Sequence, residues 1–256
     1  MGGHIKRLIV NADDLGWDDD TLETTIELIE RGWVTSATIM TGRPASSRAL
    51  DYAKRAGKFV SFGLHFNIVD GHLALNSTRN SLVDNQGCFR PSHRQRLAAL
   101  FSRLNAADIA QELRAQLFVL QQAGVAISHV DSHGHLHKFP AIAHAMLAVL
   151  KEFGITKMRR AQDTYRHRSI TDVIDAYCAW RFPKTAITTD HFYALDHIHE
   201  DWFENLPNVL RPGVTEISVH PGRSEEWRQF ECAPLQKRGP EDIRALGVTL
   251  MTYYDL

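Results

Sequence analysis

Short apolar runs alternate with longer segments of helical periodicity along the whole chain, which leaves few folds open to it. Strands are expected at residues 5–11, 33–41, 59–66, 126–131, 155–160, 185–194, 214–220 and 247–252. Helices are expected at 18–31, 45–57, 92–103, 107–123, 139–153, 169–181, 199–206 and 240–246. This alternation predicts right-handed βαβ units and a mainly parallel α/β sheet. With about seven or eight strands, a closed or slightly broken barrel is favoured over an open sheet.

The alternation is interrupted at residues 67–91, which are rich in Asn, Ser, Asp and Gly. A stretch of this length is too long for an ordinary connection. We expect an irregular insertion at about 67–105. The sequence contains no internal repeat, low-complexity run or linker, so residues 1–256 are expected to form a single domain.

Composition and charge argue against several classes of function. A net charge of −1 provides no basic field for a nucleic-acid partner. There is no long apolar segment that would span a membrane, and no signal-type apolar region near the N-terminus. Cys88, Cys178 and Cys232 are scattered and form no CxxC pair, a pattern typical of a reducing compartment. A cytoplasmic protein is therefore expected.

Acids, amides and histidines follow four of the expected strands. The carboxyl ends of parallel strands meet at one edge of a sheet or barrel, where α/β proteins carry their chemistry. We therefore expect these side chains to face one site. They are Asn11, Asp13, Asp14, His65, Asn67, Asp131, His133, His135 and His220.

Asp13 and Asp14 are adjacent acids that directly follow an apolar strand. Burying either one unpaired would cost several kcal/mol by order of magnitude. A helix N-cap would account for one of them, since Asp favours that position. The second requires a neighbouring cation or a catalytic function.

The segment "HVDSHGHLH" at residues 129–137 holds four of the 14 histidines. In an extended chain His129, Asp131 and His133 would share one face. Imidazole and carboxylate are ligands for divalent metals. The alternative is a polar loop with solvated histidines. His65 and His220 are ambiguous by themselves, although Pro-Gly after His220 would hold it in a turn at the end of its strand.

Other chemistries lack their motifs: the sequence has no G-x-S-x-G, HExxH, P-loop or strand-linked GxGxxG. What remains is one carboxylate and two histidines that could hold a metal, with a second carboxylate beside them. Three protein ligands leave positions open for water and substrate. A free Asp as base and a distant His as acid would then suit hydrolysis of an amide or ester.

Two alternatives stay open. A metal-dependent phosphoesterase could use similar ligands. However, few cations lie near the motifs in the sequence, Lys138 and Arg223 among them, whereas a phosphate clamp usually needs more. The other alternative is a non-catalytic sugar- or metal-binding protein on the same fold, against which the presence of both Asp13 and Asp14 argues.

Several motifs resemble the YdjC-like carbohydrate deacetylases, a family of chitooligosaccharide deacetylases that also has members beside hopanoid biosynthesis genes. The matching stretches run nearly end to end in the expected order. They are "NADDLG" at 11–16, "VTSATIM" at 34–40, "GLHFN" at 63–67, "SLVDNQGCF" at 81–89, "HVDSHGHLHKFP" at 129–140, "SVHPG" at 218–222 and the closing "TYYDL".

The resemblance implies a TIM-barrel-like (βα) fold, often dimeric, with one divalent metal. Mg²⁺ or Zn²⁺ is favoured, and Mn²⁺, Co²⁺ or Ni²⁺ is allowed. By similarity, Asp14, His65 and His133 would be the metal ligands, Asp13 the catalytic base and His220 the general acid. Residues that would support these groups or contact substrate are Asn11, Asn67, Asp131, His135 and Arg223.

The expected activity is metal-dependent removal of acetyl groups from N-acetylated amino sugars in oligosaccharides or glycoconjugates. The region between His65 and His129 matches the family poorly outside "SLVDNQGCF". We therefore expect the insertion at about 67–105 to lie on the substrate side and to shape the pocket.

Overall fold

The computed structural model describes residues 6–74, 80–165, 171–195 and 202–256. Its strands form one curved seven-stranded sheet in which every pairing is parallel. The strand order is β4-β3-β2-β1-β6-β5, and β7 also pairs with β1. The strands are β1 (Lys6–Leu15), β2 (Ser36–Ile39), β3 (Ser61–Phe66), β4 (Ile127–Ser132), β5 (His191–Ala194), β6 (Gly213–Val219) and β7 (Val248–Leu250).

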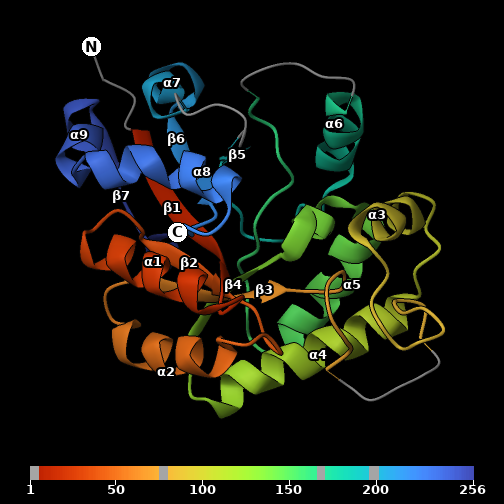
Figure 1. Cartoon of the computed structure of the whole chain (residues 1–256). Helices are drawn as coiled ribbons and strands as arrows, with labels where there is room; N and C mark the ends of the chain where they lie inside the picture. The colour runs from red at the N-terminus through yellow and green to blue at the C-terminus, as the bar shows by residue number, and fades with distance from the viewer. Residues whose placement is uncertain (1–5, 75–79, 166–170, 196–201) are drawn as a thin grey trace.

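The helices lie around the outside of this sheet (Figure 1). The α-helices are α1 (Asp19–Glu30), α2 (Ser46–Ala56), α3 (Ser92–Leu100), α4 (Ala106–Gln122), α5 (Pro140–Glu152), α6 (Asp172–Arg181), α7 (Trp202–Val209), α8 (Glu226–Lys237) and α9 (Pro240–Ala245). Two 3₁₀ helices, η1 (His133–Lys138) and η2 (Tyr253–Asp255), follow β4 and β7. No helix in the described ranges is long and apolar enough to cross a membrane.

Strand β1 is the centre of the molecule. It pairs with β6 along most of its length, with β7 at its start and with β2 toward its end. Leu8, Ile9 and Val10 are at most 1% exposed, as expected for a strand covered on both faces. The α/β architecture and parallel sheet expected from the alternation are confirmed.

The sheet is incomplete between β4 and β5. The expected strand at 155–160 is wrong, because that segment makes only single bridges, Val130↔Met158 and Lys157↔Ile187. The expected strand at 185–194 shortens to β5. The Arg160 guanidinium bonds the Thr189 and Asp190 carbonyl oxygens, just before β5. The result is a slightly broken barrel, which the sequence had allowed.

Two further expectations need correction. The first strand does not end at residue 11 but continues to Leu15. Helix α8, which has Pro234 inside it, lies where no helix was expected. The irregular character of 67–91 is confirmed for its described residues, where only the bridges His72↔Cys88 and Val83↔Phe89 form. The first residues of the helices expected at 169–181 and 199–206 lie outside the described ranges.

Candidate active site

A bulge in β1 turns two consecutive acids toward the same interior. Side chains normally alternate between the two faces of a strand, so Asp13 and Asp14 should point apart. The pairing of β1 with β2 shifts register between Ala12 and Leu15, and Asp14 has a φ of 62°. A left-handed residue of this kind is uncommon outside glycine and typical of functional sites. Both carboxylates are at most 1% exposed.

Neither acid is the N-cap of α1. Asp18 takes that position, and its side chain accepts a hydrogen bond from the Thr21 backbone N–H at 2.8 Å. The capping interpretation of the Asp13–Asp14 pair is therefore wrong. The two buried charges must be balanced inside the site.

Asp14 lies at the centre of a carboxylate–imidazole cluster. Its Oδ1 is 2.7 Å from His133 Nδ1 and 3.3 Å from His65 Nε2. Its Oδ2 accepts a hydrogen bond from Arg228 Nη2 at 2.8 Å. The three potential ligand atoms of Asp14, His65 and His133 lie within 4.8 Å of one another. The structure thus brings together the residues that the resemblance had assigned to a metal.

The far nitrogen of each histidine in this cluster already has a partner. His65 Nδ1 lies 2.7 Å from Asp131 Oδ1, and His133 Nε2 lies 3.0 Å from Asp70 Oδ2. Partners of this kind orient metal-ligating histidines. His65 Nε2 is buried and has no hydrogen-bond partner among the described residues. An orphaned imidazole nitrogen facing a carboxylate fits a divalent cation with nitrogen and oxygen ligands.

The electrostatics of the cluster favour a cation. Burial alone would raise the pKa of Asp14, but His133 and His65 hold it well below its usual range. Burial alone would lower the pKa of His65, but Asp131 and Asp14 raise it to about 10. Carboxylates therefore attract positive charge to this point, and a metal would replace the protons on the imidazoles.

Asp13 is held by a buried arginine. Arg159 Nη1 and Nη2 donate to its two carboxylate oxygens at 2.7 Å each, and Asn11 Nδ2 donates to Oδ1 at 2.8 Å. Burial would raise the pKa of Asp13, but Arg159 keeps it well below the usual value, so the carboxylate stays ionised. His135 Nε2 and His220 Nε2 lie 3.7 and 3.9 Å from its Oδ2.

His220 is held by a residue of α8. Its Nδ1 lies 2.9 Å from Glu231 Oε2, and its backbone N–H donates to the same oxygen at 2.8 Å. Burial would lower the pKa of His220, but Glu231 raises it to about 9. An imidazole with this pKa carries its proton at neutral pH, as a general acid requires.

Substituting Glu231→Gln should move the alkaline limb of the activity profile to lower pH. If His220 must be protonated, turnover falls as pH rises through its pKa, and removing the Glu231 charge lowers that pKa. The test is steady-state turnover of the wild type and the variant between pH 6 and pH 10, a range chosen to bracket the change in the pKa of His220. An unchanged alkaline limb would contradict the assignment of His220 as the acid.

Comparison with known proteins identifies the family of this chain. The sequence profile of the YdjC-like protein family matches residues 7–247. The chain belongs to the YdjC-like family. A carbohydrate deacetylase of Geobacillus stearothermophilus is 30% identical over 257 residues, covering 96% of each chain. A carbohydrate deacetylase of Brevibacillus brevis is 28% identical over 221 residues, covering 86% of this chain and 83% of the relative.

Solved structures share the fold. A protein of Enterococcus faecalis, named for cellobiose-phosphate cleavage, superposes with a TM-score of 0.75 at 22% identity, covering 98% of both chains. A peptidoglycan N-acetylglucosamine deacetylase gives a TM-score of 0.52 at 12% identity, covering 98% of this chain and 88% of that one. At these identities the likeness shows the fold alone, and it supports the expected (βα)-barrel architecture.

The histidine-rich segment of this YdjC-like chain does not stay extended. His133 and His135 lie in η1, and His135 has a φ of 54°. His129 lies on β4 away from the cluster, and its ring stacks on Tyr253 with centroids 3.6 Å apart. The prediction that His129 lines the site with Asp131 is therefore wrong. Burial lowers the pKa of His135 to about 4, so it is neutral beside Asp13.

Two residues expected near the site have other contacts. The side chain of Asn67 builds the turn at 67–70, accepting from the Val69 and Asp70 N–H groups. It thereby holds Asp70 close to His133. Arg223 bonds Glu27 and Asp20 on the surface, and a contact with substrate stays a prediction. The arginine that contacts Asp14 is Arg228.

Sequence reasoning missed four residues of the site: Arg159, Arg228, Glu231 and Asp70. Arg159 lies near the end of the segment expected as a strand at 155–160. The expectation that functional side chains follow the carboxyl ends of parallel strands could therefore have pointed to it. Arg228 and Glu231 are three residues apart on α8, one turn of a helix that was not expected. Asp70 carries no local signal, since it lies in an irregular loop.

Proposed function

We propose that this YdjC-like protein is a metal-dependent N-deacetylase of acetylated amino sugars in oligosaccharides or glycoconjugates. The observation that carries the proposal is the cluster of Asp14, His65 and His133, in which His65 Nε2 has no hydrogen-bond partner among the described residues. The names of the curated relatives support the carbohydrate substrate. Zn²⁺ suits the two imidazoles and Mg²⁺ the carboxylate, so both belong in the test.

The roles of the surrounding residues follow from their charges. A divalent metal, when bound, polarises the acetyl carbonyl and lowers the pKa of water. Asp13 is ionised and has an oxygen facing the site, so it would accept the proton of the attacking water. His220 is protonated at neutral pH and would donate to the nitrogen of the leaving amine. Asp131 and Asp70 would orient the two histidines.

The sequence argued against a phosphoesterase because few cations lie near the motifs, and the structure does not support that reason. Cations are not scarce at the site, because Arg159 and Arg228 both reach it. Both guanidinium groups, however, bond the carboxylates of Asp13 and Asp14. They neutralise the site's own acids, which leaves less positive charge for a phosphate.

The non-catalytic alternative is also less favoured. A metal-binding protein requires the Asp14 cluster, but it gains nothing from an ionised Asp13 and a protonated His220 held 3.9 Å apart. Charged groups buried at this cost are typical of catalytic sites. The homodimer and the cytoplasmic location stay predictions.

Acetate release across a panel of substrates tests the proposal. Purified protein reloaded with Zn²⁺ or Mg²⁺ would be offered short chitooligosaccharides, lipid-linked N-acetylglucosaminides and a generic phosphoester. We expect acetate from at least one N-acetylated sugar and no phosphate release. Phosphate release alone would favour the phosphoesterase, and sugar binding without turnover would favour the binding protein.

A further inference from the structure

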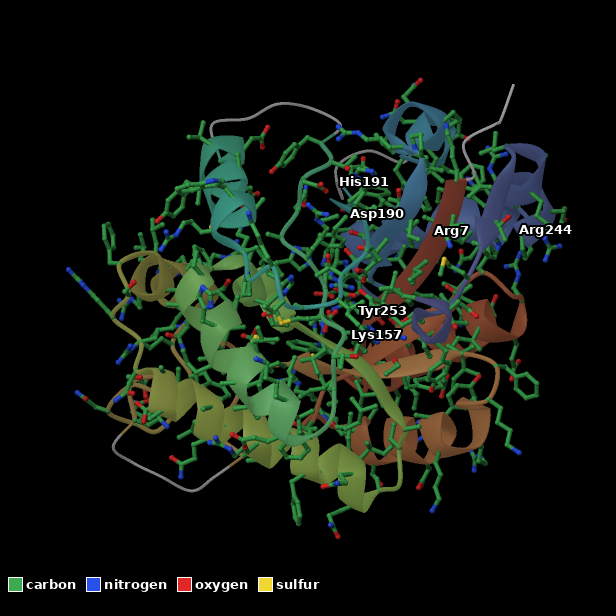
Figure 2. All side chains as sticks on the ribbon, turned by 180° about the vertical axis from the view of Figure 1, so that it is seen from behind. Arg7, Lys157, Asp190, His191, Arg244 and Tyr253 are labelled. Atoms are coloured by element: carbon green, nitrogen blue, oxygen red, sulfur yellow. The ribbon has the colours of Figure 1, made fainter. Side chains whose placement is uncertain are left out.

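The closing "TYYDL" motif packs beneath the barrel. Tyr253, in η2, donates its backbone N–H to Ser61 Oγ at 3.0 Å, and Lys157 Nζ donates to the Tyr253 carbonyl at 2.5 Å. Figure 2 shows Tyr253 and Lys157 next to each other on this side of the molecule. Ser61 is the first residue of β3, so η2 lies at the amino end of that strand, opposite the site. The Tyr253 side chain is fully buried.

The hydroxyl of Tyr253 begins a chain of hydrogen bonds that reaches the site. It donates to Glu216 Oε2 at 2.6 Å, and Glu216 Oε1 accepts from Arg159 Nε at 2.8 Å. The two Nη atoms of Arg159 then hold Asp13. Tyr253, Glu216, Arg159 and Asp13 all have 0% exposure, so no solvent competes with these bonds.

The planar guanidinium of Arg159 transmits the Glu216 contact to Asp13. Its N–H groups point in fixed directions within one plane. Fixing Nε on Glu216 therefore sets the direction of both Nη groups toward Asp13. Asp131 competes for the same group, with its Oδ2 2.7 Å from Arg159 Nη1. Without Glu216, Arg159 could tilt toward Asp131 and displace Asp13.

Tyr253 also supports the charge of Glu216. Burial raises the pKa of Glu216 to about 7, while Arg159 and the Tyr253 hydroxyl lower it. These two contacts thus favour the ionised carboxylate that pairs with Arg159. A tyrosine needed only to fill space would not require a hydroxyl here.

We propose that Tyr253 and Glu216 are positioning residues that fix Arg159, and through it the Asp13 carboxylate, from the opposite end of the barrel. The catalytic consequence rests on the proposed deacetylase function, but the placement of Arg159 does not. Neither residue touches the Asp14 cluster in the contacts described above. Their loss should affect the orientation of Asp13 and leave metal binding intact.

The test compares Tyr253→Phe with Tyr254→Phe in the full chain. Both substitutions remove one hydroxyl, but that of Tyr254 lies 3.5 Å from the Ala126 carbonyl, outside the network. Tyr253→Phe should lower kcat roughly tenfold, because a small misplacement of a catalytic group can cost up to about 10² in rate. KM and bound metal should stay unchanged. Tyr254→Phe should match the wild type in all three.

An NMR measurement makes the result independent of activity. The Arg159 Nε–H should give a slowly exchanging signal in the wild type, and its exchange should be faster in Tyr253→Phe, where Glu216 has lost the hydroxyl that holds its other oxygen. If the wild type releases no acetate, the proposed function fails and this exchange rate alone decides the inference. An unchanged exchange rate overturns it. Wild-type kcat in Tyr253→Phe, with a lower Tm as the only change, also overturns the inference. A fall in the bound metal of Tyr253→Phe overturns it as well. If Tyr253→Phe does not fold, Glu216→Gln is judged by the same measurements, because it keeps an acceptor for Arg159 Nε without the charge.

Discussion

Replacing Asp14 with asparagine is expected to remove the bound metal and the hydrolytic activity together. Asp14 supplies the carboxylate in a set that otherwise contains only His65 and His133. Asn has almost the same shape but no charge, so the site loses most of its attraction for a divalent cation. Arg228 would then lie beside a neutral amide and add repulsion. Metal content measured beside acetate release should fall in parallel, to the level of chelator-treated wild type.

Asp18→Asn is the matched control for this substitution. It makes the same change four residues away, at the N-cap of α1, where Asn caps about as well as Asp. Metal content and activity should be unchanged. An Asp14→Asn protein that keeps its metal and its turnover would exclude Asp14 as a ligand and return the site to a structural role.

Asp13→Asn is expected to keep the metal and lose turnover. A general base contributes on the order of 10²–10⁴ in rate, and an amide cannot accept the proton. The substitution also removes one partner of the buried Arg159, which commonly costs about 3 kcal/mol of unfolding free energy. Asp131 and Glu216 still pair with Arg159, so the protein should fold.

Turnover per metal-loaded, folded molecule is the quantity to compare, with folding followed by thermal unfolding. A drop in kcat at constant metal content supports Asp13 as the base. Equal metal loss in the Asp13 and Asp14 variants would instead place both carboxylates on the metal. Wild-type kcat in Asp13→Asn would exclude it from the chemistry.

Much of the fold was predictable because its signals are local. Each strand and helix leaves its own periodicity in a short window of sequence, and alternation of the two favours a parallel sheet. The same rule placed Asp14, His65 and His133 at one edge, and the structure brings them together. Errors occurred where pairing depends on distant partners, as at 155–160, where the segment makes one isolated bridge to Val130 and one to Ile187 and no continuous ladder.

Parts of the candidate site were not predictable from local pattern. The sequence around Asp13 and Asp14 does not predict the bulge that turns both side chains inward, because the bulge depends on the pairing of β1 with β2. Helix α8 brings Glu231 to His220 from eleven residues away, despite a proline in its interior. Asp70 reaches His133 from a turn that the Asn67 side chain bonds.

The sequence by itself determined the layered α/β architecture and the supply of acids and histidines at strand ends, because both follow from side-chain period and strand direction. Only the tertiary structure decided which of those groups meet. Arg159 could be assigned to Asp13, and Tyr253 connected to Arg159 through Glu216, only after segments some 40 to 150 residues apart had packed together. The charges of these buried groups are balanced by residues that lie close in space but far apart in the sequence, and packing of the core decides which residues those are.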